Sequence, residues 1–184
     1  MKSLAVTILA GAAALAIATP PGAAMAAKAP SSISGLQALS DRAAIEDLVG
    51  RYEWALDAGD AQAYGALFAE DGVLSSGFAP DQNGRAAIVK LIEDLNKRFA
   101  APSTPGGKRP MRIQHILSNL VIDLHGDRAD ARSYWTEVWN PKGPGLEVRA
   151  AGHYEDQLVK RGGKWMFSHR RIADDIMPAV TPGP

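Results

Sequence analysis

The side chains best suited to chemistry in this sequence are one carboxylate and one imidazole that lie far apart along the chain. Asp57 falls in the last turn of the first predicted helix, and His115 falls in a long apolar segment. A carboxylic acid beside a histidine can transfer protons, which typically contributes about 10²–10⁴-fold to a rate. Each residue also has a structural alternative. Asp57 can order the turn that follows it, and His115 can be a hydrogen-bonded core residue.

Other kinds of catalytic or cofactor site find little support in the sequence. No His-x-His or His-Glu-x-x-His spacing occurs, so no metal site is expected. The chain has no Cys, which excludes disulfides and thiol nucleophiles. It also has no glycine-rich phosphate loop and no Gly-x-Ser-x-Gly motif, so no cofactor is expected.

The composition is that of an ordinary globular domain. The 184 residues include 20 Lys and Arg against 20 Asp and Glu, which gives a formal net charge of zero. Binding to nucleic acid through phosphates requires a concentrated basic surface, so no nucleic-acid partner is expected. The length suits one domain.

The N-terminal segment is predicted to be a targeting sequence. Lys2 precedes an apolar stretch, which is followed by helix-breaking residues and the small-x-small site Ala24-Met25-Ala26. This layout predicts a signal peptide over residues 1–26, with a retained anchor as the alternative. We therefore expect a periplasmic or secreted protein that has no membrane segment after cleavage. A linker over residues 27–35, a domain over 36–176 and a loose tail over 177–184 complete the organisation.

Three helices are predicted in the first half of the domain. Ser40-Asp41 is a suitable helix start, and apolar residues at helical spacing continue to a stop at Gly59. A second helix is expected over Ala61–Phe68 and a third over Arg85–Phe99. A short strand is expected between them, over Gly72–Ser76.

Beyond residue 111 the apolar periodicity changes from helical spacing to alternation. Short turns separate the resulting segments, which predicts antiparallel neighbours. The expected fold is α+β, with three N-terminal helices packed in a strongly curved, mainly antiparallel β-sheet that forms a cone with an internal pocket. The four long strands are predicted over Arg112–Leu124, Arg128–Asn140, Leu146–Lys160 and Lys164–Asp174.

Several motifs are similar to those of a known family. The segment Tyr52-Glu53-Trp54-Ala55 with the later Leu67–Gly72, and Gly152–Asp156 with Gly163–Phe167, resemble the SnoaL-like family of the nuclear transport factor 2-like superfamily. Within that family the chain looks most like the scytalone dehydratases, whose Arg-Ile-Gln-His motif it shares at residues 112–115. The resemblance implies a helix-lined α+β cone, a fold that hosts dehydratases, isomerases, cyclases, hydrolases and non-catalytic binders.

The resemblance implies two catalytic residues. Asp57 matches the pocket aspartate of the dehydratases, and His115 matches their first pocket histidine. The second pocket histidine falls near Asn140, and the two water-orienting tyrosines fall at Leu56 and Ser76. These differences argue against scytalone as the substrate and leave acid–base chemistry open.

The same resemblance suggests residues that bind substrate. Tyr134, Val138 and Asn140 share one strand face, which by analogy lines the pocket, and Tyr154 is expected to face the cavity with His153 facing outward. Trp54 is either a pocket wall or an interface residue. Arg170 falls at a pocket-facing position, although an arginine at a strand end is usually solvated.

For two of these candidates a purely structural role is equally compatible with the sequence. Tyr134 can be a core residue, and Asn140 can lead into the turn before Pro141. Trp135 and Trp139 would face outward, where two exposed tryptophans suggest a homo-oligomer interface.

The function expected from these observations is that of a cofactor-independent lyase. It would act by Asp/His acid–base chemistry on a small hydrophobic substrate, aromatic or cyclic and hydroxylated, through loss of water or a retro-aldol-type elimination. If the protein is exported, its substrate is expected to be a compound scavenged from outside the cell, such as an aromatic compound that enters catabolism. The alternatives are an isomerase on the same pocket and a non-catalytic periplasmic binding protein.

Overall fold

The computed structural model describes residues 35–77, 79–99, 113–139 and 145–176. The predicted signal peptide (1–26), nearly all of the linker (27–35), the tail (177–184) and Asn140 lie outside the described residues. Within the described ranges no helix is both long and apolar enough to cross a lipid bilayer.

The described part of the chain forms three helices, and the first is longer than the sequence predicted. They are α1 (Gly35–Ala58), α2 (Ala61–Gly65) and α3 (Arg85–Phe99). Gly59 ends α1 with φ 65°, a conformation that glycine adopts without strain, and Asp60 caps α2 through Ala63 N–H. The prediction that α1 starts at Ser40-Asp41 is wrong. The buried Asp41 carboxylate instead accepts hydrogen bonds from Lys160 Nζ (2.7 Å) and Trp165 Nε1 (2.9 Å).

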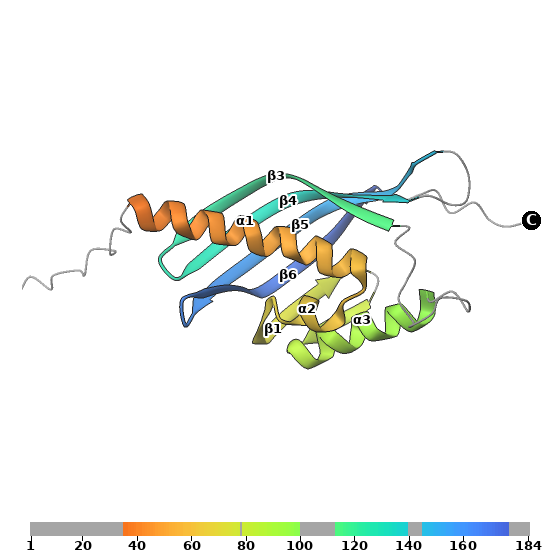
Figure 1. Ribbon diagram of the computed structural model, residues 1–184, viewed down its shortest axis with the longest axis horizontal. Coiled ribbons are helices and arrows are strands. Elements are labelled where there is room, and N and C mark those ends of the chain that lie inside the picture. Colours follow the sequence, from red (N-terminus) through yellow and green to blue (C-terminus); the bar gives the residue numbers. More distant parts are fainter. Residues whose placement is uncertain (1–34, 78, 100–112, 140–144, 177–184) are drawn as a thin grey trace, which may run out of the picture. The chain divides into compact units, whose positions relative to one another are not determined.

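In the described residues, six strands form one curved, open sheet (Figure 1). The strands are β1 (Phe68–Ser76), β2 (Ala79–Asn83), β3 (Ile113–His125), β4 (Arg128–Trp139), β5 (Glu147–Arg161) and β6 (Lys164–Ile176). Their spatial order is β2-β1-β6-β5-β4-β3, and every neighbouring pair is antiparallel except β1 and β6, which run parallel. The prediction that the second helix extends to Phe68 is wrong, because α2 stops at Gly65 and Phe68 already begins β1.

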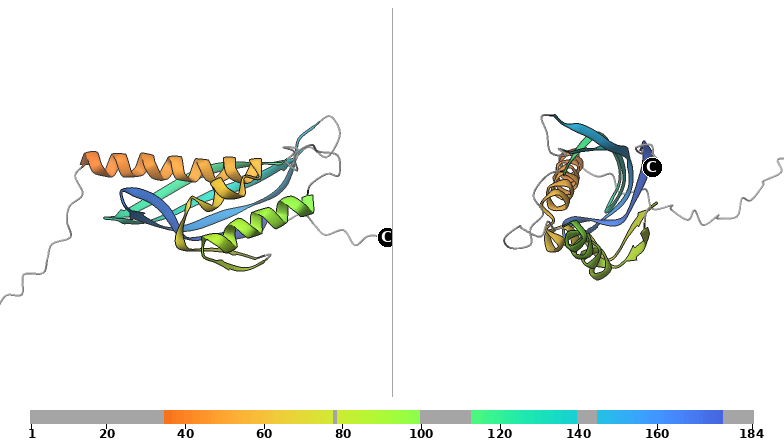
Figure 2. Two further views of the ribbon diagram at one scale, coloured as in Figure 1. Left: turned by 60° about the horizontal axis from the view of Figure 1, so that its bottom comes forward. Right: turned by 90° about the vertical axis from the view of Figure 1, so that its right-hand side faces the viewer.

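The helices cover the concave face of the sheet, and the core lies between them (Figure 2). The buried apolar side chains of α1 pack against a cluster of aromatic side chains from α1, α2, β1, β5 and β6, in which neighbouring ring centroids lie 4.6–6.3 Å apart. Rings of this kind bury large apolar areas and fix how the elements pack. The members of this cluster are Tyr52, Tyr64, Phe68, Tyr154 and Phe167. The α+β class, with helices packed in a curved and mainly antiparallel sheet, is confirmed.

One irregularity in β3 decides which side chains face the helices. Near the hairpin turn, His125 pairs with Arg128, and continued pairing without interruption would bring His115 opposite Val138. A β-bulge between Ser118 and Val121 inserts one extra residue, and Asn119 there has φ 54°. His115 therefore pairs with Glu137. Because a one-residue shift moves every following side chain to the other face, this bulge sets the composition of the site.

Candidate active site

A chamber of about 460 Å³ lies between α3 and the concave face of the sheet. Its apolar lining comes from α1, α3 and four strands, with α3 contributing the most residues, and its polar groups come mainly from β3 to β6. The apolar lining residues are Leu56, Leu74, Leu91, Ile92, Leu95, Ile113, Ala150 and Ile172; the others are Tyr64, Arg98, His115, Trp135, Glu137, Arg149, Tyr154 and Asp174.

The structure brings the two candidate catalytic residues together at the wall of this chamber. His115 Nδ1 lies 2.7 Å from Asp57 Oδ1, and the backbone N–H of His115 donates to Asp57 Oδ2 at 3.1 Å. Both side chains are largely buried, with 14% of His115 and 10% of Asp57 exposed. His115 lines the chamber, whereas Asp57 lies behind it on α1. Asp57 therefore fixes the ring and the tautomer, and Nε2 is the ring nitrogen left for chemistry.

A second carboxylate lies near the other ring nitrogen. Glu137 Oε2 is 3.7 Å from His115 Nε2, and Glu137 Oε1 accepts a hydrogen bond from Arg149 Nη1 at 2.9 Å. Glu137 and His115 are direct cross-strand partners, so their side chains emerge on the same face. The imidazole thus has a carboxylate on each side, and one of the two is shared with an arginine.

These carboxylates set the basicity of the imidazole. Burial alone would lower the pKa of His115, because it disfavours the charged ring. The hydrogen bond to Asp57 and the negative charges of Glu53, Asp57 and Glu137 outweigh burial and raise the pKa of His115 above its ordinary value of 6.5. The ring is therefore a stronger base than a free histidine.

The predicted orientation of β4 is wrong. Tyr134 is 53% exposed and lies on the outer face of the sheet with Val138, whereas Trp135 is 5% exposed and lines the chamber with Glu137. The physical reason lies in the first half of the strand, where Ala129 and other small odd-numbered residues are buried and the alternation runs on to Trp135. The suggestion that Trp135 contributes to an exposed subunit interface is therefore also wrong.

The candidates on β5 and β6 occupy different settings. Tyr154 is buried and lines the chamber, while His153 lies on the opposite face, where its Nδ1 is 2.7 Å from Asp175 Oδ2. Arg170, considered as a pocket or solvated residue, is fully buried beside the chamber instead of lining it. Its guanidinium donates to both oxygens of Asp156, at 2.7 and 2.6 Å.

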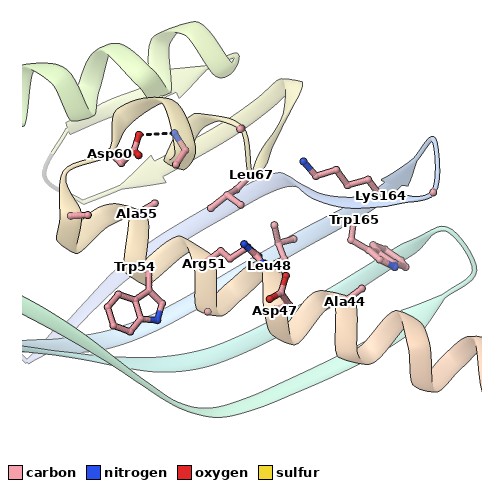
Figure 3. A pocket seen from close by; sticks show the side chains of 15 residues that line it. Ala44, Asp47, Leu48, Arg51, Trp54, Ala55, Asp60, Leu67, Lys164 and Trp165 are labelled. Atoms are coloured by element: carbon pink, nitrogen blue, oxygen red, sulfur yellow. Dashed lines mark hydrogen bonds and ion pairs between the residues drawn. The ribbon is translucent and has the colours of Figure 1, made fainter.

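Trp54 lies outside the chamber. It is 70% exposed and lines a larger surface groove of about 1010 Å³ along the outer side of α1 and α2 (Figure 3). Three of the four charged side chains that line this groove are engaged in local contacts: Arg51 pairs with Asp47 at 2.6 Å, and Asp60 caps α2. The groove has no buried acid–base pair, so the chamber is the better site for chemistry.

Sequence reasoning missed Glu137 and also a more deeply buried acidic group, Glu53. It is 6% exposed and accepts a hydrogen bond of 3.5 Å from the Tyr154 hydroxyl. The signal was present in the sequence, because Ile45, Val49, Glu53 and Asp57 recur every four residues along one face of α1. A carboxylate on an otherwise apolar stripe marks a buried polar site.

No metal site accompanies these groups in the described part of the chain, where no cluster of three or more His, Asp and Glu side chains is placed to hold an ion. The polar arrangement can bind a small molecule and move protons, with His115 at its centre.

Comparison with known proteins places the chain in a family. The SnoaL-like domain family matches residues 37–171, which span both the helices and the sheet. The chain therefore belongs to the SnoaL-like family. No curated protein matches the chain at a significant level.

Solved structures share the same fold. A nuclear transport factor 2-like protein with a cystatin-like fold from Novosphingobium aromaticivorans has 25% sequence identity and a TM-score of 0.66, over 79% of this chain and 88% of its own. A protein of unknown function from Nostoc punctiforme has 28% identity and a TM-score of 0.63, over 77% and 96% of the two chains. A candidate scytalone dehydratase from N. aromaticivorans has 24% identity and a TM-score of 0.61, over 79% and 97%.

Proposed function

We propose that this protein is a cofactor-independent lyase that uses His115 as its general base. The observation that carries the proposal is the contact of 2.7 Å between Asp57 and His115 at the wall of a chamber large enough for a small cyclic molecule. SnoaL-like membership supports a lyase or isomerase type of activity. One structural neighbour is a candidate scytalone dehydratase, and its likeness to this chain is one of fold.

The proposed reaction is an elimination. His115 Nε2 takes a proton from a carbon next to an activating carbonyl group, the bond from the neighbouring carbon to its hydroxyl group breaks, and a double bond forms. The departing hydroxide takes the proton back from the imidazolium and leaves as water. Asp57 stabilises the imidazolium that forms in between, and the Tyr154 hydroxyl is placed to hydrogen-bond the substrate oxygen.

The lining of the chamber supports a hydrophobic ring as the substrate. Leu91, Ile92 and Leu95 of α3 contribute apolar side chains to the lining, and Trp135 and Tyr154 contribute aromatic side chains. This lining suits a flat hydroxylated ring whose polar edge is directed toward His115. A retro-aldol-type loss of formaldehyde from the same class of substrate requires the same base.

The experiment is a screen of the purified protein against phenolic, steroid and terpene alcohols, with products analysed by mass spectrometry. Loss of one water identifies a dehydratase, and loss of formaldehyde identifies a retro-aldol lyase. His115→Ala is expected to lower kcat/KM by about 10²–10⁴-fold. The matched control is His153→Ala, which removes an imidazole with the same 2.7 Å aspartate contact on the outer face of the sheet.

Two outcomes of this screen would contradict the lyase proposal and support another function. A product of unchanged mass whose formation depends on His115 would indicate an isomerase, because one base can remove a proton and return it to another carbon. Tight binding without turnover, unaffected by His115→Ala, would indicate a small-molecule binding protein.

We also propose that the protein acts in the periplasm or outside the cell, on the strength of the N-terminal pattern around Lys2 and Ala24-Met25-Ala26. Cell fractionation combined with N-terminal sequencing tests this. Export with cleavage after residue 26 supports the proposal, and an intact N-terminus in the cytoplasmic fraction contradicts it.

A further inference from the structure

Glu53 is a buried carboxyl group that the proposed reaction does not use. It lies one helical turn before Asp57, on the same face of α1. Only 6% of the residue is exposed. Its Oε1 is buried and has no hydrogen-bond partner among the described residues, while its Oε2 meets the Tyr154 hydroxyl at 3.5 Å. A buried carboxyl group with so few partners is costly to keep, which calls for an explanation.

The connection to the chamber runs through Tyr154. This side chain is 2% exposed and belongs to the chamber wall, and its hydroxyl is the group that contacts Glu53. A tyrosine hydroxyl has one proton to donate, and its oxygen can accept. When the hydroxyl donates to an ionised Glu53, it offers a molecule in the chamber only an acceptor. When a protonated Glu53 donates to Tyr154, the tyrosine proton is free to point at that molecule.

We propose that Glu53 is a positioning residue that sets the direction of the Tyr154 hydroxyl, and thereby decides whether this part of the chamber wall offers the bound molecule a hydrogen-bond donor or an acceptor. The inference rests on the proposed function only in that the chamber holds a small molecule. It refines the substrate class: with Glu53 protonated, the wall can hydrogen-bond a ring oxygen that only accepts, such as a ketone or an ether, whereas with Glu53 ionised it requires a hydroxyl group that donates.

The surroundings of Glu53 allow this change near neutral pH. Burial raises the pKa of Glu53 to about 7. The groups that face it are Asp57 on α1, His115 on β3, Tyr154 on β5 and Arg170 on β6. Asp57 acts in the same direction as burial, whereas Arg170 and His115 favour the ionised form.

The test is a binding experiment with two probes of nearly the same shape. 2-Naphthol can both donate and accept, whereas 2-methoxynaphthalene can only accept. His115 also changes from hydrogen-bond acceptor to donor when it is protonated, which would add a second pH effect. All proteins in the test therefore carry His115→Ala, and His115→Gln replaces it if the alanine variant does not fold. Dissociation constants are measured by tryptophan fluorescence in buffers well below and well above neutral pH.

In this background, 2-methoxynaphthalene is expected to bind about tenfold more weakly at the higher pH, where Tyr154 donates to Glu53, while 2-naphthol changes little. Glu53→Gln replaces the carboxyl group with an amide that does not ionise, so each probe is expected to bind this variant with the same affinity at both pH values. Tyr154→Phe should abolish the pH effect. The matched control Glu155→Gln alters a half-exposed glutamate on the opposite face and should behave like the parent.

Three results would overturn the inference: a ratio of dissociation constants that does not change with pH, a pH effect that persists in Glu53→Gln, or a chamber that binds neither probe. Turnover is not needed for this test. A chain that shows the predicted binding pattern but converts no compound would refute the lyase proposal and leave this inference standing.

Discussion

The buried ion pair between Arg170 and Asp156 lies beside the chamber, and its contribution to the stability of the fold can be tested directly. Both side chains are 0% exposed. The guanidinium donates two charge-assisted hydrogen bonds, at 2.7 and 2.6 Å, and lies 4.0–4.1 Å from the ring centroids of Tyr52, Tyr154 and Phe167. Asp156→Asn removes the only charge that compensates this cation at contact distance within the described residues.

The expected loss can be worked from these contacts. Breaking a buried ion pair by removing one partner costs about 3–5 kcal/mol, since the remaining charge stays uncompensated. With a urea dependence of about 2 kcal/mol per M, Asp156→Asn should lower the unfolding midpoint by about 2 M. Replacing both partners with apolar residues, as in Arg170→Met with Asp156→Leu, removes the buried charges together and should cost far less.

Urea unfolding followed by circular dichroism measures both changes. A loss below about 1 kcal/mol for Asp156→Asn would refute the reasoning, because the guanidinium would then have another acceptor or access to water. The double variant also tests whether ligand binding depends on Arg170. Because Arg170 does not line the chamber, a folded double variant is expected to keep its ligand affinity, and loss of binding with folding intact would show that the site depends on this arginine.

Three further predictions follow from the chamber. If neutral His115 is the base, kcat/KM should rise with pH along a limb whose midpoint lies above 6.5, and Glu137→Gln should move that midpoint down because it removes a charge that raises the pKa of His115. Gly152→Ala should lower the melting temperature strongly, because its Cβ would lie 1.9 Å from the Ala173 carbonyl oxygen and 2.7 Å from Trp135 Cζ2; an unchanged melting temperature would contradict this packing. Tyr134→Phe should leave ligand affinity in the chamber unchanged, and equal losses for Tyr134→Phe and Tyr154→Phe would contradict the assignment of the strand faces.

The architecture was predictable because its signals are local. Apolar spacing placed α3 at the residues where it is found, and alternation with short turns placed the four long strands to within one or two residues at each end. The edge strand β2 has the sequence Ala-Pro-Asp-Gln-Asn, which carries no apolar alternation. Its strand structure depends on pairing with β1, which is a tertiary effect that local propensity does not encode.

The pairing of Asp57 with His115 came from family resemblance, whereas the wrong orientation of β4 came from extending that resemblance too far. The correct signal was local: Arg128 and Asp130 alternate with the small apolar Ala129 and Ala131, which puts the odd-numbered residues inside. The bulge at Asn119 was not predictable from alternation, because β3 has apolar residues on both faces around it. That bulge is what places Glu137 beside His115.

The central claim is that Asp57 holds and activates His115 at the chamber wall, and a nuclear magnetic resonance titration of the His115 ring tests it without a substrate. We predict a pKa above 6.5 in the wild type, a proton on Nδ1 in the neutral ring, and a lower pKa in Asp57→Asn. The same pKa in both proteins, or a neutral ring protonated on Nε2, would contradict the account.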